Sequence, residues 1–202
     1  MAIQNFNAVY IISDENLKAL ENKALSELDI RRLLHSLSTG QVLYRLYPQC
    51  GKKNARFIAL FHDIAHHWTS FELRSYIKDH NIHLEDGEDA RDILLHAPIA
   101  ADLLRRMVPD CPDEWVNAIR RHTIPHKDMS ELSYALFVAD IIEPTRPFIR
   151  DEEREKVYAM KSNDARMLYS MREQGKYLRS QGSDHLKCTE ELMDILSKKC
   201  QI

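Results

Sequence analysis

Apolar residues recur at intervals of three and four along most of this chain, which is the spacing of residues on one face of an α-helix. One series runs through Ile30, Leu33 and Leu37, and another runs through Leu132 and Leu136. Because no stretch alternates with a period of two, the sequence predicts an all-α fold. The predicted helices cover residues 26–46, 53–66, 71–78, 90–107, 115–121, 130–142, 151–161, 164–176 and 184–199.

The domain organisation follows from the length and from the absence of a linker. The 202 residues fit one domain, and no segment rich in glycine, serine or proline divides them. The low count of 5 glycines argues against a turn-dense β-sandwich. We expect residues 1–28 to form a short helical appendage at the N-terminus and residues 29–202 to form a single helical bundle.

Charge and cysteine content narrow the partners and the compartment. Lys and Arg number 28 against 31 acidic residues, so the chain lacks the basic field that holds a nucleic-acid backbone. The four cysteines have no CxxC spacing, as expected of reduced thiols in the cytoplasm. The first residues lack the pattern of a signal peptide, and no apolar run is long enough to cross a membrane. We therefore expect a cytoplasmic protein that binds neither nucleic acid nor membrane, and a homodimer remains open.

Six polar residues stand inside or next to apolar helical runs, where their side chains are expected to point into the core. An ionised or polar group in such a place is costly unless it is paired or bound to a metal. Separate core hydrogen bonds for each residue are the alternative. Imidazole and carboxylate together suit Fe, Mn, Co or Zn better than Mg or Ca. The six candidate metal ligands are His35, His62, Asp63, His96, His122 and Asp140.

The order H…HD…H…H…D, together with FIALFHDIA, LLHAPIAADLL and VADIIEPTRPF, resembles the HD-domain superfamily. Over residues 30–196 the chain is most similar to the YqeK-type family, the bacterial symmetrical bis(5'-nucleosyl)-tetraphosphatases. The resemblance implies two metal ions, with iron as the expected metal. One ion would be held by His35, His62, Asp63 and Asp140, and the other by Asp63, His96 and His122, with Asp63 bridging them.

The resemblance also suggests contacts to the substrate. Arg146 matches an arginine placed near the substrate phosphates, although a salt bridge to Glu143 is the alternative. His185 matches a C-terminal histidine whose role is structural or adjacent to the substrate. We expect Asp63, Arg146 and His66 to act in catalysis. The expected substrate contacts are Arg146, His66, Arg121 and Lys127.

Two positions depart from the pattern of that family. His66 stands where a lysine is usual, and histidine ordinarily titrates near neutrality. Residues 124–128 replace a loop that contains glycine and arginine, and His126 or Lys127 can supply the missing charge. His66, His67 and His126 are equally well interpreted as solvated surface residues. These changes leave the predicted metal ligands intact but put substrate preference in question.

The predicted function is the hydrolysis of diadenosine tetraphosphate, or a related dinucleoside tetraphosphate, to two nucleoside diphosphates. Two adjacent metal ions provide a nucleophile at neutral pH by lowering the pKa of water. Three alternatives remain at this stage. They are an HD-type phosphohydrolase of another nucleotide (a nucleotidase or phosphodiesterase), an HD-type di-iron oxygenase, and a catalytically silent binding module stabilised by metal.

Overall fold

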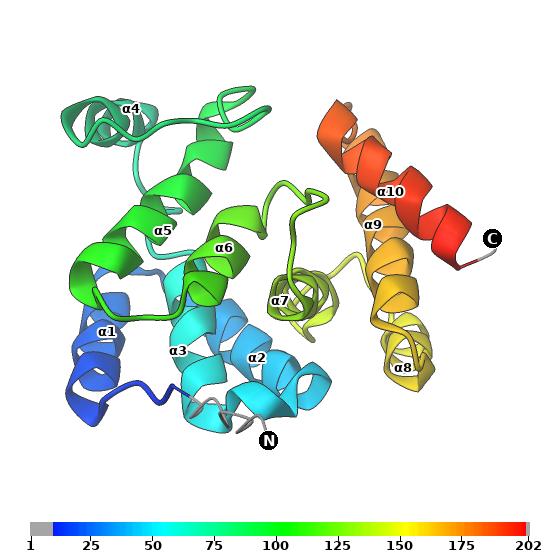
Figure 1. Cartoon of the computed structure of the whole chain (residues 1–202), viewed down its shortest axis with the longest axis horizontal. Coiled ribbons are helices and arrows are strands. Elements are labelled where there is room, and N and C mark those ends of the chain that lie inside the picture. The colour runs from blue at the N-terminus through cyan, green and yellow to red at the C-terminus, as the bar shows by residue number, and fades with distance from the viewer. Residues whose placement is uncertain (1–9, 201–202) are drawn as a thin grey trace, which may run out of the picture.

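The computed structural model describes residues 10–200, and within them every regular element is a helix, which confirms the all-α prediction. Ten α-helices and two short 3₁₀ helices follow one another along this part of the chain (Figure 1). The α-helices are α1 (Asp14–Glu27), α2 (Ile30–Leu46), α3 (Lys52–His62), α4 (Ser70–Asp79), α5 (His96–Met107), α6 (Asp113–Arg121), α7 (Glu131–Ile142), α8 (Asp151–Ala159), α9 (Asn163–Ser180) and α10 (Lys187–Lys199). The 3₁₀ helices are η1 (Pro48–Cys50) and η2 (Asp92–Leu95).

The helix predicted over residues 26–46 is wrong at its beginning. The structure ends α1 at Glu27 and starts α2 at Ile30. Asp29 lies between them in an extended conformation, and its carboxylate accepts hydrogen bonds from the backbone N–H groups of Arg31 and Arg32. An aspartate in this role satisfies donors that the first turn of a helix leaves unpaired.

Two other predicted helices differ in ways that place metal-ligand candidates at helix ends. α3 ends at His62 rather than at residue 66, so Asp63 is the C-cap and residues 64–67 form turns. The segment predicted as one helix over 90–107 is divided into η2 and α5, and α5 begins at His96. Pro98 is consistent with this start, because proline lacks a backbone N–H and is tolerated in the first turn of a helix.

A core of apolar side chains joins most of the helices. α2 packs against α3 and α7, α6 lies between α5 and α7, and α9 packs against α7. α9 and α10 form an antiparallel pair on one side of the molecule, with α5 and α6 on the other (Figure 1). Leu20 and Ala24 of α1 are buried in the same core as Phe57 of α3. Residues 1–9 of the predicted N-terminal appendage lie outside the described part of the chain.

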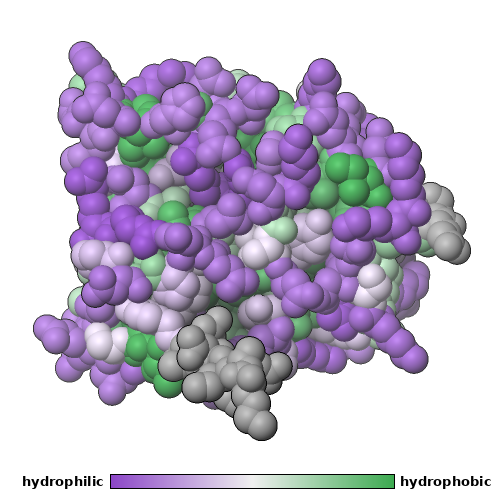
Figure 2. Space-filling view, in the orientation of Figure 1, coloured by the Kyte–Doolittle hydropathy of each residue, from purple (hydrophilic) through white to green (hydrophobic). Residues whose placement is uncertain are grey.

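The outer surface is dominated by polar side chains. On the face in Figure 2, hydrophilic residues cover most of the area and hydrophobic residues form separate small groups. In residues 10–200 none of the helices combines the length and the apolar character that crossing a bilayer requires.

Candidate metal centre

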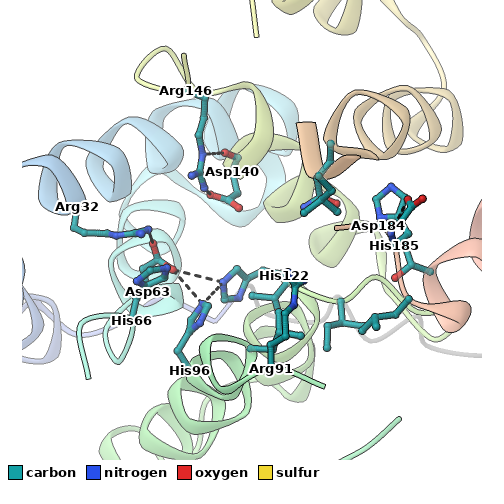
Figure 3. Close-up of a pocket in the computed structure, with 17 residues that line it drawn as sticks. Arg32, Asp63, His66, Arg91, His96, His122, Asp140, Arg146, Asp184 and His185 are labelled. Carbon is teal, nitrogen blue, oxygen red and sulfur yellow. Dashed lines mark hydrogen bonds and ion pairs between the residues drawn. The ribbon is translucent and has the colours of Figure 1, made fainter. Parts of the chain in front are cut away.

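The six candidate ligands lie on five different helices or at their ends, and the structure brings them together at one place. His35 lies on α2, the pair His62-Asp63 ends α3, His96 begins α5, His122 follows α6, and Asp140 lies on α7. Each of the six side chains belongs to a residue no more than 7% exposed. Figure 3 shows Asp63, His96 and His122 pointing toward one another.

The carboxylate of Asp63 lies between two groups of ligands and turns one oxygen toward each. Its Oδ1 atom lies 3.3 Å from Nε2 of His96 and 3.7 Å from Nε2 of His122. Its Oδ2 atom lies 3.7 Å from Nε2 of both His35 and His62. This arrangement suits a carboxylate that is shared by two cations.

Three of the histidines are held in the same tautomer by the same interaction, a hydrogen bond from Nδ1 to the backbone carbonyl three residues earlier. Nδ1 of His62 lies 2.5 Å from the carbonyl oxygen of Ala59, three residues earlier. Nδ1 of His122 lies 2.6 Å from the carbonyl of Ile119, and Nδ1 of His96 makes the equivalent bond to Ile93. A carbonyl can only accept, so each Nδ1 carries the proton and each Nε2 presents a lone pair.

These lone pairs lack donors, which is the observation that tests whether the residues fit a metal ion. Nε2 of His62 is buried and has no hydrogen-bond partner among the described residues, although it lies 3.6 Å from Oδ1 of Asp140. Nε2 of His96 and Nε2 of His122 face each other at 3.0 Å. Acceptors that are buried, unpartnered and directed at one another are unfavourable unless a cation lies between them. The donor set therefore fits transition-metal ions.

His35 is held by carboxylates instead of a backbone carbonyl. Its Nδ1 lies 2.9 Å from Oε1 of Glu143, and its Nε2 lies 2.8 Å from Oδ1 of Asp140. Glu143 is fully buried and also accepts hydrogen bonds from the backbone and hydroxyl of Thr145. A carboxylate behind a metal-binding histidine fixes the orientation of the ring and raises its basicity.

The electrostatics keep the two aspartates ionised. Burial alone would raise the pKa of Asp63, but the neighbouring His62, His122 and His96 together lower the pKa by a larger amount. The pKa therefore falls well below its usual range. Burial likewise raises the pKa of Asp140, but the positive charge of Arg146 and the hydrogen bond from His35 together lower it well below its usual range. Burial lowers the pKa of His35, yet its bonds to Asp140 and Glu143 raise it to about 9.

Two arginines reach this cluster. Arg146 forms an ion pair with Asp140 through its side chain, and its Nε donates to the carbonyl of Asp140 at 2.8 Å. The predicted salt-bridge alternative for Arg146 is thus present, but mainly with Asp140, because Glu143 lies 4.0 Å away. Nη1 of Arg32 donates to Oδ2 of Asp63 at 2.7 Å. The sequence analysis missed Arg32, although its position three residues before His35 places both on one face of α2.

A cavity of about 190 Å³ opens onto the cluster. It is bordered on one side by Arg32 and Arg146 and on the other by the segment that carries His185 (Figure 3). His185 bonds to the carbonyl of Met171 at 2.9 Å, so it combines a structural contact with a place in the cavity wall. Arg91, which directly precedes η2, also lines the cavity and was not among the residues predicted from the sequence.

His66 lies in the wall of the cavity, but its charge differs from that of a histidine that titrates near neutrality. It lines the cavity, and its ring centroid is 4.7 Å from that of His96. Burial lowers the pKa of His66 to about 3, so the side chain is neutral at pH 7. It therefore replaces the usual lysine with an uncharged hydrogen-bonding group and not with one that titrates near neutrality.

The structure does not bring Arg121 or Lys127 to the cavity. Arg121 is only 5% exposed, and its guanidinium forms ion pairs with Glu85 and Asp128. Lys127 is exposed and does not line the cavity. This geometry gives no support to the expectation that these two residues contact the substrate, which stays a prediction. His126 bonds to Asp128 instead of replacing the missing charge in the cavity.

The part of the chain that carries the candidate ligands is similar to a known protein family. The model of the HD domain family matches residues 32–145, which carry all six candidate ligands. The chain belongs to the HD-domain family. The match confirms the resemblance inferred from the motifs.

Two curated relatives are named symmetrical bis(5'-nucleosyl)-tetraphosphatase. The protein of Bacillus subtilis is 30% identical over 143 residues, which cover 69% of this chain and 75% of the relative. The protein of Halalkalibacterium halodurans is 33% identical over 124 residues, which cover 61% of this chain and 65% of the relative, slightly less than two thirds of its length. These relatives place the chain among the hydrolases of the family.

The fold is also found in a solved structure. A crystal structure from Clostridium acetobutylicum, described as a predicted HD superfamily hydrolase involved in NAD metabolism, matches with a TM-score of 0.79 at 23% identity. The match covers 94% of this chain and 100% of the other.

Proposed function

We propose that this HD-domain protein hydrolyses dinucleoside tetraphosphates symmetrically, with diadenosine tetraphosphate as the representative substrate and two molecules of ADP as products. The names of the two relatives support the substrate class. The observation that carries the chemistry is the Asp63 carboxylate, which turns one oxygen toward His35 and His62 and the other toward His96 and His122.

The donor set supports two transition-metal ions, of which iron is the first choice and Mn, Co or Zn are alternatives. His35, His62, Asp63 and Asp140 would hold one ion, and Asp63, His96 and His122 would hold the other. When bound, such ions supply Lewis acidity that activates water at neutral pH and neutralises phosphoryl oxygens. The apolar residues around the ligands exclude bulk water and keep the ligands in position.

The two arginines have the geometry to bind the phosphate chain. Arg32 and Arg146 both line the cavity, and both carry a planar guanidinium suited to bidentate contact with phosphate. In the structure, Arg32 forms an ion pair with Asp63 and Arg146 forms one with Asp140. A metal ion on the same carboxylates would compete for the oxygens and leave the guanidinium groups available to the substrate. His66, neutral at pH 7, can donate one hydrogen bond without adding charge.

The test is hydrolysis of diadenosine tetraphosphate by the iron-loaded protein, followed by chromatography of the nucleotides. We expect ADP alone, and in ¹⁸O-labelled water one heavy oxygen in one ADP of each pair, because a single attack inserts one solvent oxygen. Protein treated with a chelator is the control and should be inactive. AMP together with ATP would contradict symmetrical cleavage. Release of phosphate from a mononucleotide, without turnover of the dinucleotide, would favour a phosphohydrolase of another nucleotide.

A further inference from the structure

A second cavity adjoins the metal centre. It has a volume of about 270 Å³ and lies between the start of α2 and the segment 145–147. His35 lines it, so it reaches the same cluster as the first cavity. Arg32 and Arg146 line both cavities, and these two side chains form the boundary between them.

The second cavity has a positive charge that the metal centre does not explain. Arg31 lines it, is exposed, and forms no ion pair within residues 10–200. The acid in the wall, Asp29, uses one carboxylate oxygen to cap α2. With Arg32 and Arg146, which pair with Asp63 and Asp140 of the metal centre, the cavity wall has three guanidinium groups and one carboxylate, a set of donors that suits a polyphosphate.

The sizes of the two cavities point to a shared ligand. Cavities that enclose a drug-sized molecule are usually about 300–1,000 Å³. At about 190 and 270 Å³, neither cavity can enclose a molecule with two nucleosides and four phosphates. A substrate cut at its middle must extend in both directions from the metal centre, and the two cavities lie on either side of Arg32 and Arg146.

We propose that the second cavity binds one nucleoside diphosphate half of the substrate while the first cavity binds the other half, with Arg31 as a phosphate-binding residue of the second cavity. This inference rests on the proposed function. It gives a physical reason for selecting a dinucleotide, because a mononucleotide fills one cavity and forgoes the contacts with Arg31.

Arg31→Ala tests the proposal, and Arg172→Ala is the matched control because Arg172 is an exposed arginine of α9 that lines neither cavity. In the iron-loaded protein, Arg31→Ala should raise the KM for diadenosine tetraphosphate about tenfold or more, as loss of one charge-assisted phosphate contact implies. Its kcat should change little. Arg31→Glu should raise KM more, and Arg31→Lys should restore part of the loss.

Calorimetric titration with ADP provides a readout that does not depend on turnover. The iron-loaded wild-type protein should bind two molecules of ADP, and in Arg31→Ala one of these two sites should be weaker by the same factor as the rise in KM. If Arg31→Ala behaves like Arg172→Ala in both experiments, or if an active wild-type protein binds a single ADP, the second cavity is not a substrate site. If the wild-type protein binds two molecules of ADP with Arg31 dependence but does not cleave diadenosine tetraphosphate, the proposed function fails and the cavity assignment stands.

Discussion

Two groups of polar residues, one buried throughout and one only in part, meet at adjacent positions of the chain. His122 points into the metal centre, whereas Arg121, the residue before it, belongs to a network of charged side chains on the loop between α4 and η2. In that network, Arg120 pairs with Glu88 at 2.6 Å, and Arg121 pairs with Glu85 and Asp128. Glu88 is 2% exposed and also accepts from the backbone of Glu85.

The difference lies in how completely each group is satisfied. In the charged network every guanidinium faces a carboxylate, and the one unpartnered atom is Nε of Arg121. In the metal centre, imidazole lone pairs face one another or face carboxylates. The paired charges satisfy one another, whereas buried acceptors without donors are suited to bind a cation. Burial alone does not distinguish the two groups, because Arg121 and Glu88 are as buried as the metal-ligand candidates.

We expect the largest effect on the metal centre from Asp63→Asn. The substitution keeps the volume of the side chain but removes the charge shared by the two groups of ligands. We expect bound metal to fall from about two ions per chain to well under one, and hydrolysis to fall by roughly 10³-fold or more. Elemental analysis and turnover measure the two effects. A variant that keeps both metals after this substitution would exclude a bridging role for Asp63.

Glu143→Gln tests whether the hydrogen bond between His35 and Glu143 contributes to metal affinity. Glutamine keeps the shape, but it removes the charge that orients the Nδ1 proton of His35. Metal affinity should fall by about 10- to 100-fold at the ion that His35 holds, with a smaller effect at the other. Competition with a chromophoric chelator measures both affinities. Glu155→Gln, at an exposed position on α8, is the control and should leave both unchanged.

Glu88→Gln makes the corresponding change in the charged network. It removes the principal partner of Arg120, so the free energy of unfolding should fall by about 1.5 kcal/mol, as expected for a hydrogen bond to a charged group. Urea denaturation measures the loss. Metal content should remain that of the wild type. A loss of metal in this variant would mean that the network also holds the ligands in place.

The smallest effect is expected from His66→Gln, and it depends on pH. Because the pKa of His66 is about 3 in the folded protein and near 6.5 when unfolded, protonation favours the unfolded state between these values. Its contribution to stability is present above pH 6.5 and is lost as the pH falls toward 3. Between pH 7 and pH 5 the free energy of unfolding of the metal-free wild type should therefore fall by about 1 kcal/mol more than that of the metal-free variant, roughly half of the full linkage value because the side chain is partly exposed. Equal acid sensitivity of the two proteins would indicate that His66 is solvated.

Most of the helices, and the buried cluster formed by the six candidate ligands, could be predicted from the sequence because both leave local signals. A polar residue inside an apolar run, such as Asp140 in VADII, is conspicuous without any alignment. The break at residues 28–29 was missed because Leu28 continues the apolar period, and the capping preference of Asp29 was the available signal. The direction of Arg121 could not be predicted, since it ends α6 and its partners lie on distant loops.

The carbonyl bonds to the histidines have a consequence for the order in which the centre assembles. His62, His96 and His122 each obtain the correct tautomer from a carbonyl three residues away, so a single helical turn prepares each of them. His35 depends on Glu143, which is 108 residues away along the chain. During folding, three ligands are thus ready for metal as soon as their own turns form. The fourth becomes ready only when α7 docks on α2, which makes that contact the step that completes the centre.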